Sequence, residues 1–340
     1  MKILKDIKKT IDSANINFLI GSGLSFPFLD ILNNIEIKLV KAEENYIPQE
    51  ISELKKEYFE KSMVGNLKII DKKVDKEKNE VLNNYENFYK IINHIVLKRE
   101  NSILTKQINV FTTNIDIFSE KALENTGIEF DDGFHGKFNP RYDIGNFKKS
   151  YFKKSLHYEN TSEIPVFNIL KLHGSLSWKK EGKVIYLDHV LSTVRETEDK
   201  KNSPEFEEIY KKLMIINPTK QKFDNTIFDE YYYDLLRIYS NELEKENSVL
   251  FVMGFSFADE HIYKLTLRVA DSNPTLKIYI FSHKSSSSKI YENIEKNAKN
   301  KNIEIVSPEE GMEYDFKTLN TEIFEKIIPF KRELVDGVLE

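Results

Sequence analysis

The feature that most constrains the fold is residues 248–253, an almost uninterrupted apolar run that leads directly into Gly254. A strand buried on both faces of a parallel sheet reads as such a run, whereas a half-solvated strand alternates apolar and polar residues. Residues 166–172 and 276–281 have the same character, and helical patterns lie between the runs. This alternation predicts an α/β fold in which a doubly wound, Rossmann-like parallel sheet carries helices on both faces.

The periodicity of the remaining chain places further elements around this sheet. Additional strands are expected at 16–20, 107–112, 213–216 and 303–306, with a hairpin over 179–187. Helices are expected at 2–14, 48–59, 81–95, 117–125, 228–246, 259–268, 287–300 and 321–327. Residues 71–80 read as a solvated linker and 190–225 as connecting structure. We expect a single domain over 1–340, with a mainly helical insertion at about 31–105 and a loop-rich lobe at about 130–165.

Composition excludes several kinds of site. The chain has 340 residues, 40% of them hydrophobic and 31% charged, which is ample for a buried core and argues against global disorder. It has no cysteine, which excludes disulfides, a thiol nucleophile and a cysteine-based zinc site. A formal net charge of −5 argues against a nucleic-acid coating role, so we expect no direct nucleic-acid binding. Without a signal peptide or an apolar run of ~18 residues, we expect a cytoplasmic protein that does not associate with membranes.

Short polar motifs follow four of the predicted strands, where the carboxyl ends of a parallel sheet form the usual ligand site. Glycines after a strand let the backbone approach a pyrophosphate, and a following helix N-terminus offers free N–H groups. The same glycines are equally consistent with a tight turn. The motifs are Gly21-Ser22-Gly23-Leu24-Ser25, Thr112-Thr113-Asn114-Ile115-Asp116, Lys171-Leu172-His173-Gly174-Ser175 and Gly254-Phe255-Ser256.

Together the four motifs resemble those of the sirtuin family, and in particular its bacterial antiphage branch of sirtuin-like NAD hydrolases. Sirtuins carry Gly-Ala-Gly-x-Ser, Gln-Asn-Ile-Asp, Leu-His-Gly and Gly-Thr-Ser in the same order as 21–25, 113–116, 172–174 and 254–256 here. The extended form Gly-Phe-Ser-Phe-Ala-Asp-Glu-His at 254–261 looks more like the defence branch than the deacylases.

Two departures from the sirtuin pattern bear on activity. Sirtuin deacylases hold a structural zinc with four cysteines, and this chain has none. They also carry Gly-Ile-Pro-Asp-Phe-Arg after the glycine loop, where this chain reads Phe26-Pro27-Phe28-Leu29-Asp30. The resemblance therefore implies an NAD glycohydrolase, which cleaves NAD to nicotinamide and ADP-ribose without a metal and depletes NAD in antiphage defence by abortive infection. A protein deacylase is the least expected activity.

The resemblance assigns roles that each have a structural alternative. His173 becomes the general base, or a turn histidine bonded to backbone. Asn114 orients water and ribose, or forms an Asx turn before the next helix. Asp116 binds the nicotinamide carboxamide, or caps that helix. The remaining predicted NAD contacts are Gly21, Ser22, Gly23 and Ser25 at the pyrophosphate, and Gly254 and Ser256 at the adenosine-side ribose or phosphate.

The resemblance also implies partners. An NAD-depleting enzyme must be restrained until it is triggered, and stand-alone sirtuin-like chains of this branch act with a separate HerA-type DNA-translocating ATPase, often as large oligomers. We therefore expect a homo-oligomer with such an ATPase as partner. The alternative is a non-catalytic NAD or ADP-ribose sensor subunit of a defence complex, which would need the glycine motifs but not His173.

Overall fold

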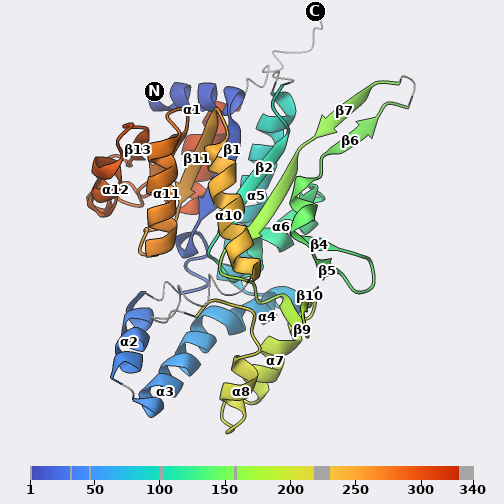
Figure 1. The fold of residues 1–340 in the computed structure, drawn as a ribbon, viewed down its shortest axis with the longest axis vertical. Helices are drawn as coiled ribbons and strands as arrows, with labels where there is room; N and C mark the ends of the chain where they lie inside the picture. The colour runs from blue at the N-terminus through green and yellow to red at the C-terminus, as the bar shows by residue number, and fades with distance from the viewer. Residues whose placement is uncertain are drawn as a thin grey trace, which may run out of the picture.

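A seven-stranded parallel sheet forms the centre of the molecule in the computed structural model, which describes residues 2–30, 33–45, 47–99, 103–156, 159–217 and 230–328 (Figure 1). The strand order is β13-β12-β11-β1-β2-β8-β3. This arrangement confirms the predicted doubly wound α/β fold. The strands are β1 (Asn15–Ile20), β2 (Gln107–Thr112), β3 (Phe130–Asp131), β8 (Val166–Lys171), β11 (Ser248–Met253), β12 (Lys277–Phe281) and β13 (Ile303–Val306).

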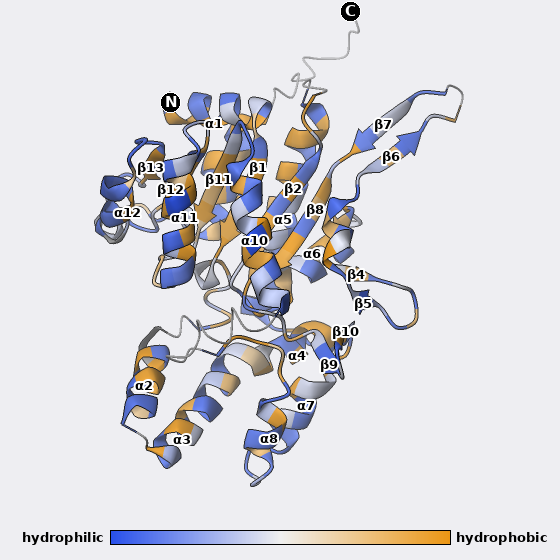
Figure 2. Ribbon diagram, viewed as in Figure 1, coloured by the Kyte–Doolittle hydropathy of each residue, from blue (hydrophilic) through white to orange (hydrophobic). Residues whose placement is uncertain are grey.

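Helices cover both faces of the sheet, so its central strands are buried on both sides. Along β1, Phe18 joins the core on one face and Leu19 joins the core on the other, as the two-residue period of a strand requires. Figure 2 shows the resulting contrast between apolar strands and the hydrophilic outer surfaces of the helices. One face carries α1 (Lys2–Ser13), α5 (Lys76–Lys98) and α6 (Phe118–Thr126); the other carries α10 (Glu230–Glu244), α11 (Glu260–Ser272) and α12 (Glu292–Asn297).

The order of the strands reverses beside β1. From β1 the chain moves to β2 on one side, and after β8 it crosses to β11 on the other side. The loops that leave β1 and β11 therefore start at neighbouring strand ends and lead the chain to opposite halves of the sheet. Open α/β sheets bind ligands at such a position. The glycine motifs at 21–25 and 254–256 both lie at this switch point.

Three asparagines form a buried ladder across the middle of the sheet. Asn17, Asn109 and Asn168 are register partners on β1, β2 and β8. Asn109 donates to Asn17 Oδ1 at 2.9 Å, and Asn168 donates to Asn109 Oδ1 at 2.9 Å. Asn109 also donates to Glu242 Oε2 of α10 at 3.0 Å. The ladder ties β1, β2 and β8, three of the four strands that lead into polar motifs, to one another and to α10.

A separate group of helices lies beyond the carboxyl edge of the sheet (Figure 1). We call α2 (Asn33–Glu44), α3 (Pro48–Phe59), α4 (Gly65–Ile70), α7 (Ser192–Asp199) and α8 (Phe206–Tyr210), with the π-helical turn Glu60–Val64, the helical lobe. Segments far apart in sequence meet there, because the Phe59 and Phe206 rings pack edge to face with centroids 6.2 Å apart. The expectation that 190–225 is only connecting structure is wrong, since α8 packs Phe206 and Tyr210 against Phe59 of α3 and α7 contacts α8 and the π-helical turn.

Several predicted boundaries change. The expected strand at 213–216 is a single bridge between Ile215 and Gly174, because the chain there runs along the loop after β8 rather than along a strand. Helix α5 begins at Lys76, capped by Asp75, inside the expected linker. The expected helix at 287–300 divides into a 3₁₀ turn (Ser285–Ile290) and α12. The expected start of α10 at residue 228 lies outside the described residues.

Smaller elements complete the fold. A four-stranded antiparallel sheet holds β4 (Phe134–His135), β5 (Arg141–Tyr142), β10 (Val184–Leu187) and β9 (Trp178–Glu181), the last two forming the predicted hairpin. Strands β6 (Tyr151–Lys154) and β7 (Thr161–Ile164) project as a two-stranded arm. The C-terminal helical segment runs from α13 (Phe316–Thr318) through a π turn (Leu319–Phe324) to Ile327. No helix among the described ranges is long and apolar enough to cross a membrane.

Candidate active site

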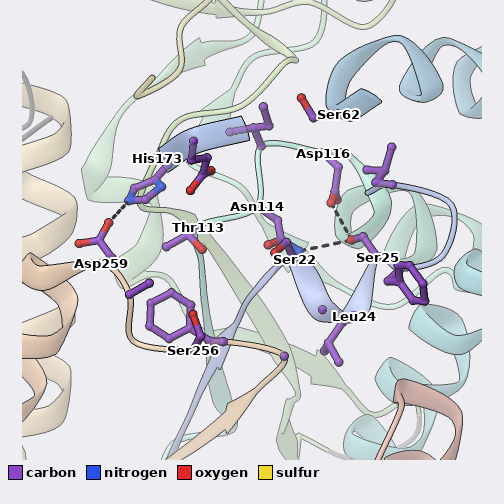
Figure 3. Close-up of a pocket in the computed structure, with 18 of the residues that line it drawn as sticks. Ser22, Leu24, Ser25, Ser62, Thr113, Asn114, Asp116, His173, Ser256 and Asp259 are labelled. Carbon is purple, nitrogen blue, oxygen red and sulfur yellow. Dashed lines mark hydrogen bonds and ion pairs between the residues drawn. The ribbon is translucent and has the colours of Figure 1, made fainter. Parts of the chain in front are cut away.

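A cavity of about 1020 Å³ lies between the carboxyl edge of the sheet and the helical lobe. Its size is at the upper end of the roughly 300–1,000 Å³ that small-molecule sites occupy. The loops after β1, β2, β8 and β11 line one side, while Glu36, Tyr58 and Ser62 line it from the helical lobe. Figure 3 shows His173 and Asp259 at one end of the drawn site and Ser25 with Asp116 at the other, with Asn114 between them.

The glycine motifs bring the loops after β1 and β11 into direct contact. Gly23 N donates to Gly254 O at 3.1 Å, and Gly21 N donates to Met253 O at 3.0 Å. A Cβ on Gly21 would lie 2.8 Å from Phe255 Cα, and one on Gly254, which has a φ of 61°, would lie 2.9 Å from Leu24 N. No side chain fits at these positions, so the glycines are required for the close approach of the two loops.

The expected helix N-terminus after Gly23 is absent. Residues Ser22–Leu24 form one 3₁₀ turn, and the chain then bends toward the helical lobe. The N–H groups of Gly21 and Gly23 are bound to β11 and its loop rather than directed at a ligand. The glycines therefore shape the floor of the cavity by permitting tight packing, and a phosphate would meet other donors.

Ser25, Asp116, Asn114 and Tyr85 form a buried hydrogen-bond network on the cavity wall. Ser25 Oγ donates to Asp116 Oδ2 at 2.7 Å, so it accepts from Tyr85, whose hydroxyl lies 3.1 Å away. Burial, and then the nearby Asp116 carboxylate, raise the pKa of Tyr85 well above its usual value, so the phenol keeps its proton. The other oxygen of Asp116 accepts from Phe118 N at 3.1 Å and supports the start of α6.

The network fixes the orientation of the Asn114 amide. Its Nδ2 donates to Gly21 O at 3.2 Å, and a carbonyl oxygen can only accept, so this end of the amide must be the nitrogen. Nδ2 also lies 3.3 Å from Ser25 Oγ. Asn114 is 7% exposed, and its Oδ1 has no hydrogen-bond partner among the described residues. A buried acceptor on a cavity wall that lacks a donor points to a ligand hydroxyl or water.

Lys171 holds the loop that carries Asn114 and Asp116. It is the last residue of β8, its side chain is 3% exposed, and its ammonium lies 3.2 Å from Glu120 Oε1 on α6. The same ammonium donates to Asn114 O at 3.3 Å and to Asp116 O. Burial raises the pKa of Glu120, and the Lys171 charge opposes that shift. The side chains of Asn114 and Asp116 are thus held through their own backbone carbonyls.

His173 follows directly after β8 and lines the same cavity. Its Nε2 lies 2.9 Å from Asp259 Oδ2, and the two side chains are 13% and 7% exposed. The other carboxylate oxygen of Asp259 accepts from His261 N at 3.1 Å and Ile262 N at 3.3 Å, so Asp259 also caps α11. Asp259 therefore caps α11 with one carboxylate oxygen and contacts His173 with the other.

Comparison with protein families adds an independent finding. The sequence profile of the SIR2-like domain matches residues 108–306, which is more than half of the chain. The chain belongs to the SIR2-like family. Among solved structures, one described as "Structural Basis for the Mechanism and Regulation of Sir2 Enzymes" is similar, with 11% identity, a TM-score of 0.40 and coverage of 96% of this chain and 98% of the other. No curated protein sequence matches.

Membership of the SIR2-like family indicates an NAD-related function, and one feature of the cavity fits a dinucleotide. Asn114 Oδ1, which has no hydrogen-bond partner among the described residues, suits a ribose hydroxyl or water. Within the described part of the chain, no group of three or more His, Asp or Glu side chains is arranged to hold a metal ion.

The SIR2-like fold brings the predicted site residues to one place. Asn114, His173 and Asp116 all line the cavity. Gly21 lies immediately beneath its wall, where its carbonyl accepts from Asn114. The remaining predicted contacts also line it: Ser22, Gly23, Ser25, Gly254 and Ser256. Their roles toward NAD stay predictions.

Three residues of this site escaped the sequence interpretation. Tyr85 reads as part of the buried stripe of α5, and nothing in the sequence shows that its hydroxyl reaches Ser25. Asp259 reads as a helix cap and also contacts His173. Lys171 carried a signal, because a lysine ending an otherwise apolar strand must find partners in the interior.

Proposed function

We propose that this chain is an NAD glycohydrolase that cleaves NAD to nicotinamide and ADP-ribose. The observation that carries the proposal is that one cavity holds both a histidine in contact with a carboxylate and an asparagine whose amide oxygen has no partner in the described part of the chain. Membership of the SIR2-like family supplies the NAD-related class of substrate.

The proposed reaction needs little covalent help from the protein. The nicotinamide of NAD is a pyridinium and already a good leaving group, so the bond from ribose C1′ to the ring nitrogen breaks with its electron pair going to nicotinamide. Water forms the new C1′–O bond and loses one proton. His173 accepts that proton, either from the water or through a ribose hydroxyl, and such general-base assistance is worth roughly 10²–10⁴-fold.

Asn114 and Asp116 complete the proposed chemistry. Asn114 Oδ1 accepts from the attacking water or a ribose hydroxyl, and holds it in place because Nδ2 is fixed by Gly21 O. The buried Asp116 carboxylate, held by Ser25 and Phe118 N, lines the cavity and in this proposal accepts from the nicotinamide carboxamide. Preorganised groups of this kind need no rearrangement during the reaction.

Nicotinamide release from NAD by the purified chain tests the proposal. We expect His173→Ala to lower turnover by about 10²–10⁴-fold, and Asn114→Ala by about 10²–10³-fold. The matched controls are His94→Ala and Asn87→Ala, both on the exposed face of α5, which should keep wild-type turnover. Turnover that survives both site substitutions would refute the proposal. NAD binding without turnover in any assembly state would instead favour a nucleotide sensor.

We further propose that the activity serves antiphage defence by NAD depletion in the cytoplasm. The support is the similarity of residues 254–261 to the defence branch of the sirtuins. A HerA-type DNA-translocating ATPase and a homo-oligomeric assembly are the proposed partners, on the same support. These two proposals are tested by measuring nicotinamide release with and without the ATPase, on protein fractions separated by size. A rate that is the same with and without the ATPase and in every size fraction would contradict regulation by partner and assembly.

A further inference from the structure

We propose that Asp259 is a positioning residue, which holds the His173 imidazole in the tautomer and orientation needed for proton transfer. The proposal rests on the proposed NAD hydrolysis, because it concerns the same histidine. It goes beyond that function by assigning a second task to a residue whose position in sequence indicates only a helix cap.

The first argument is that the Asp259 carboxylate is itself immobilised. One oxygen accepts from His261 N and Ile262 N at the N-terminus of α11, a helix of 13 residues. That helix end stabilises negative charge, which favours the ionised carboxylate and holds it in place. The second oxygen lies 2.9 Å from His173 Nε2.

The second argument concerns the tautomer. An ionised carboxylate has no proton to donate, so the approach of His173 Nε2 to 2.9 Å from Asp259 Oδ2 favours the ring form that carries its hydrogen on Nε2. The neutral ring has only one N–H, and in that form the basic lone pair of His173 is on Nδ1. When Nδ1 takes a proton, the carboxylate stabilises the imidazolium without becoming protonated, as in other carboxylate–histidine pairs.

The third argument is that the contact is built across the sheet. His173 follows β8 and Asp259 follows β11, and strands β1 and β2 lie between them. The loop after β11 must therefore pass over the carboxyl edge to deliver Asp259. Phe257 in this loop has a φ of 58°, a conformation that is unfavourable for a bulky residue. Its ring packs edge to face against Phe255 with centroids 5.1 Å apart, which holds the loop in that path.

Other ionisable groups near the pair differ from Asp259 in their surroundings. Glu260 and Lys264 on α11 pair with each other at 2.7 Å and are 70% and 67% exposed, so solvent screens them. The two carboxylate oxygens of Asp116 accept from Ser25 Oγ and Phe118 N, which lie away from the His173–Asp259 pair. His261 on α11 also lines the cavity, and Tyr232 on α10 lies beside Gly174.

The test is Asp259→Asn, which keeps an oxygen for the helix cap and replaces the charged oxygen with an amide nitrogen. We expect kcat for nicotinamide release to fall by about 10–100-fold, the effect typical of removing the partner of a functional histidine, with KM little changed. In a His173→Ala background the same substitution should have no further effect, because the role acts through that ring. Asp75→Asn is the matched control: it changes the cap of α5, where Asp75 accepts from Lys78 N at 3.0 Å, and should keep wild-type kcat.

A separate readout distinguishes failure of this proposal from failure of the proposed function. The ring protons of His173 can be followed by NMR through a pH titration and assigned by their loss in His173→Ala. Removing a carboxylate at this distance should move the midpoint of that titration to lower pH by about 1–3 units. An unchanged midpoint, or a full additional loss of kcat in the His173→Ala background, would overturn the positioning role. A shifted midpoint in a chain that never cleaves NAD would sustain the pair and refute only the hydrolase.

Discussion

Replacing Lys171 with methionine is the sharpest test of how the site is held together. The substitution keeps the length and apolar stem of the side chain and removes its charge. The lost ammonium lies 3.2 Å from Glu120 Oε1 and donates to the carbonyls of Asn114 and Asp116. The change therefore leaves a buried acid and two backbone acceptors without their donor.

The expected cost follows from the burial of the pair. The side chains of Lys171 and Glu120 are 3% and 17% exposed, so solvent cannot replace the lost partner. Removing one member of a buried ion pair typically costs about 3–5 kcal/mol, because the other charge remains buried and unpaired. We expect Lys171→Met to lower the free energy of unfolding by that amount at neutral pH. This is a large share of the roughly 5–15 kcal/mol that stabilises a typical domain.

The pH dependence of the loss has a definite sign. Burial raises the pKa of Glu120 above its ordinary value of 4.5, and the Lys171 charge counteracts this. Without the ammonium the pKa of Glu120 rises further, so the native state binds a proton that the unfolded state has released. Stability then falls as pH rises from 4.5 through the raised pKa of Glu120, and the variant should be closest to wild type in acid.

Urea unfolding followed by circular dichroism between pH 4 and pH 8 measures this loss. Glu120→Gln in the Lys171→Met background should recover part of the stability and flatten its pH dependence, since the unpaired charge is gone. Lys121→Met is the matched control, on α6, the helix that also carries Glu120. Lys121 pairs with Glu124, and the two side chains are 21% and 66% exposed. Such surface pairs contribute about 0–1 kcal/mol. Equal losses for Lys171→Met and Lys121→Met, or a loss that grows in acid, would refute the reasoning.

Two further predictions concern the sheet and the glycine contact. Asn109→Ala removes the middle of the asparagine ladder and should lower the free energy of unfolding by about 1–3 kcal/mol for each buried group left unpaired. Turnover per folded molecule should be unchanged. A loss below about 1 kcal/mol in urea unfolding would contradict this prediction. In Gly254→Ala, a residue with a φ of 61° gains a Cβ that lies 2.9 Å from Leu24 N, whereas in Gly182→Ala a residue with a φ of 63° gains a Cβ with nothing within 4 Å. Both variants should lose about 1–2 kcal/mol of unfolding free energy because alanine disfavours the left-handed conformation. Only Gly254→Ala should also weaken NAD binding in calorimetry, and equal binding by the two variants would contradict the role of the loop contact.

The sequence predicted the parts of the fold whose signals are local. Strands β1, β2, β8 and β11 were identifiable because each is a short, largely apolar run that ends in a polar motif. Gly127, directly after α6, adopts a φ of 64°, the left-handed conformation that favours glycine at a helix end. The rule that ligands bind at the carboxyl edge of a parallel sheet predicts where the cavity lies. Each of these signals lies within about ten residues of what it predicts.

Features that depend on distant contacts could not be predicted in the same way. Helices α7 and α8 are short, and the aromatic residues of α8 pack against Phe59 of α3, more than 100 positions earlier in the chain. The Tyr85 hydroxyl reaches Ser25 because α5 crosses beneath the loop after β1. The contact of Asp259 with His173 joins loops from β11 and β8. In each case the residue looks ordinary in its own segment, and only the topology gives it a partner.

The positions of these partners imply that the site and the fold are stabilised together. Asn114 is bound to the β1 loop through Gly21 and to β8 through Lys171, and Asp116 is bound to the β1 loop through Ser25. A side-chain change at Asn114 therefore removes both the proposed ligand contact and the Nδ2 bond to the β1 loop, while its backbone carbonyl keeps the contact with Lys171. Loss of turnover in such a variant separates chemistry from folding only when its unfolding free energy is measured alongside. His173 makes the cleaner catalytic test, because the Lys171 links that hold the Asn114 loop do not pass through its ring.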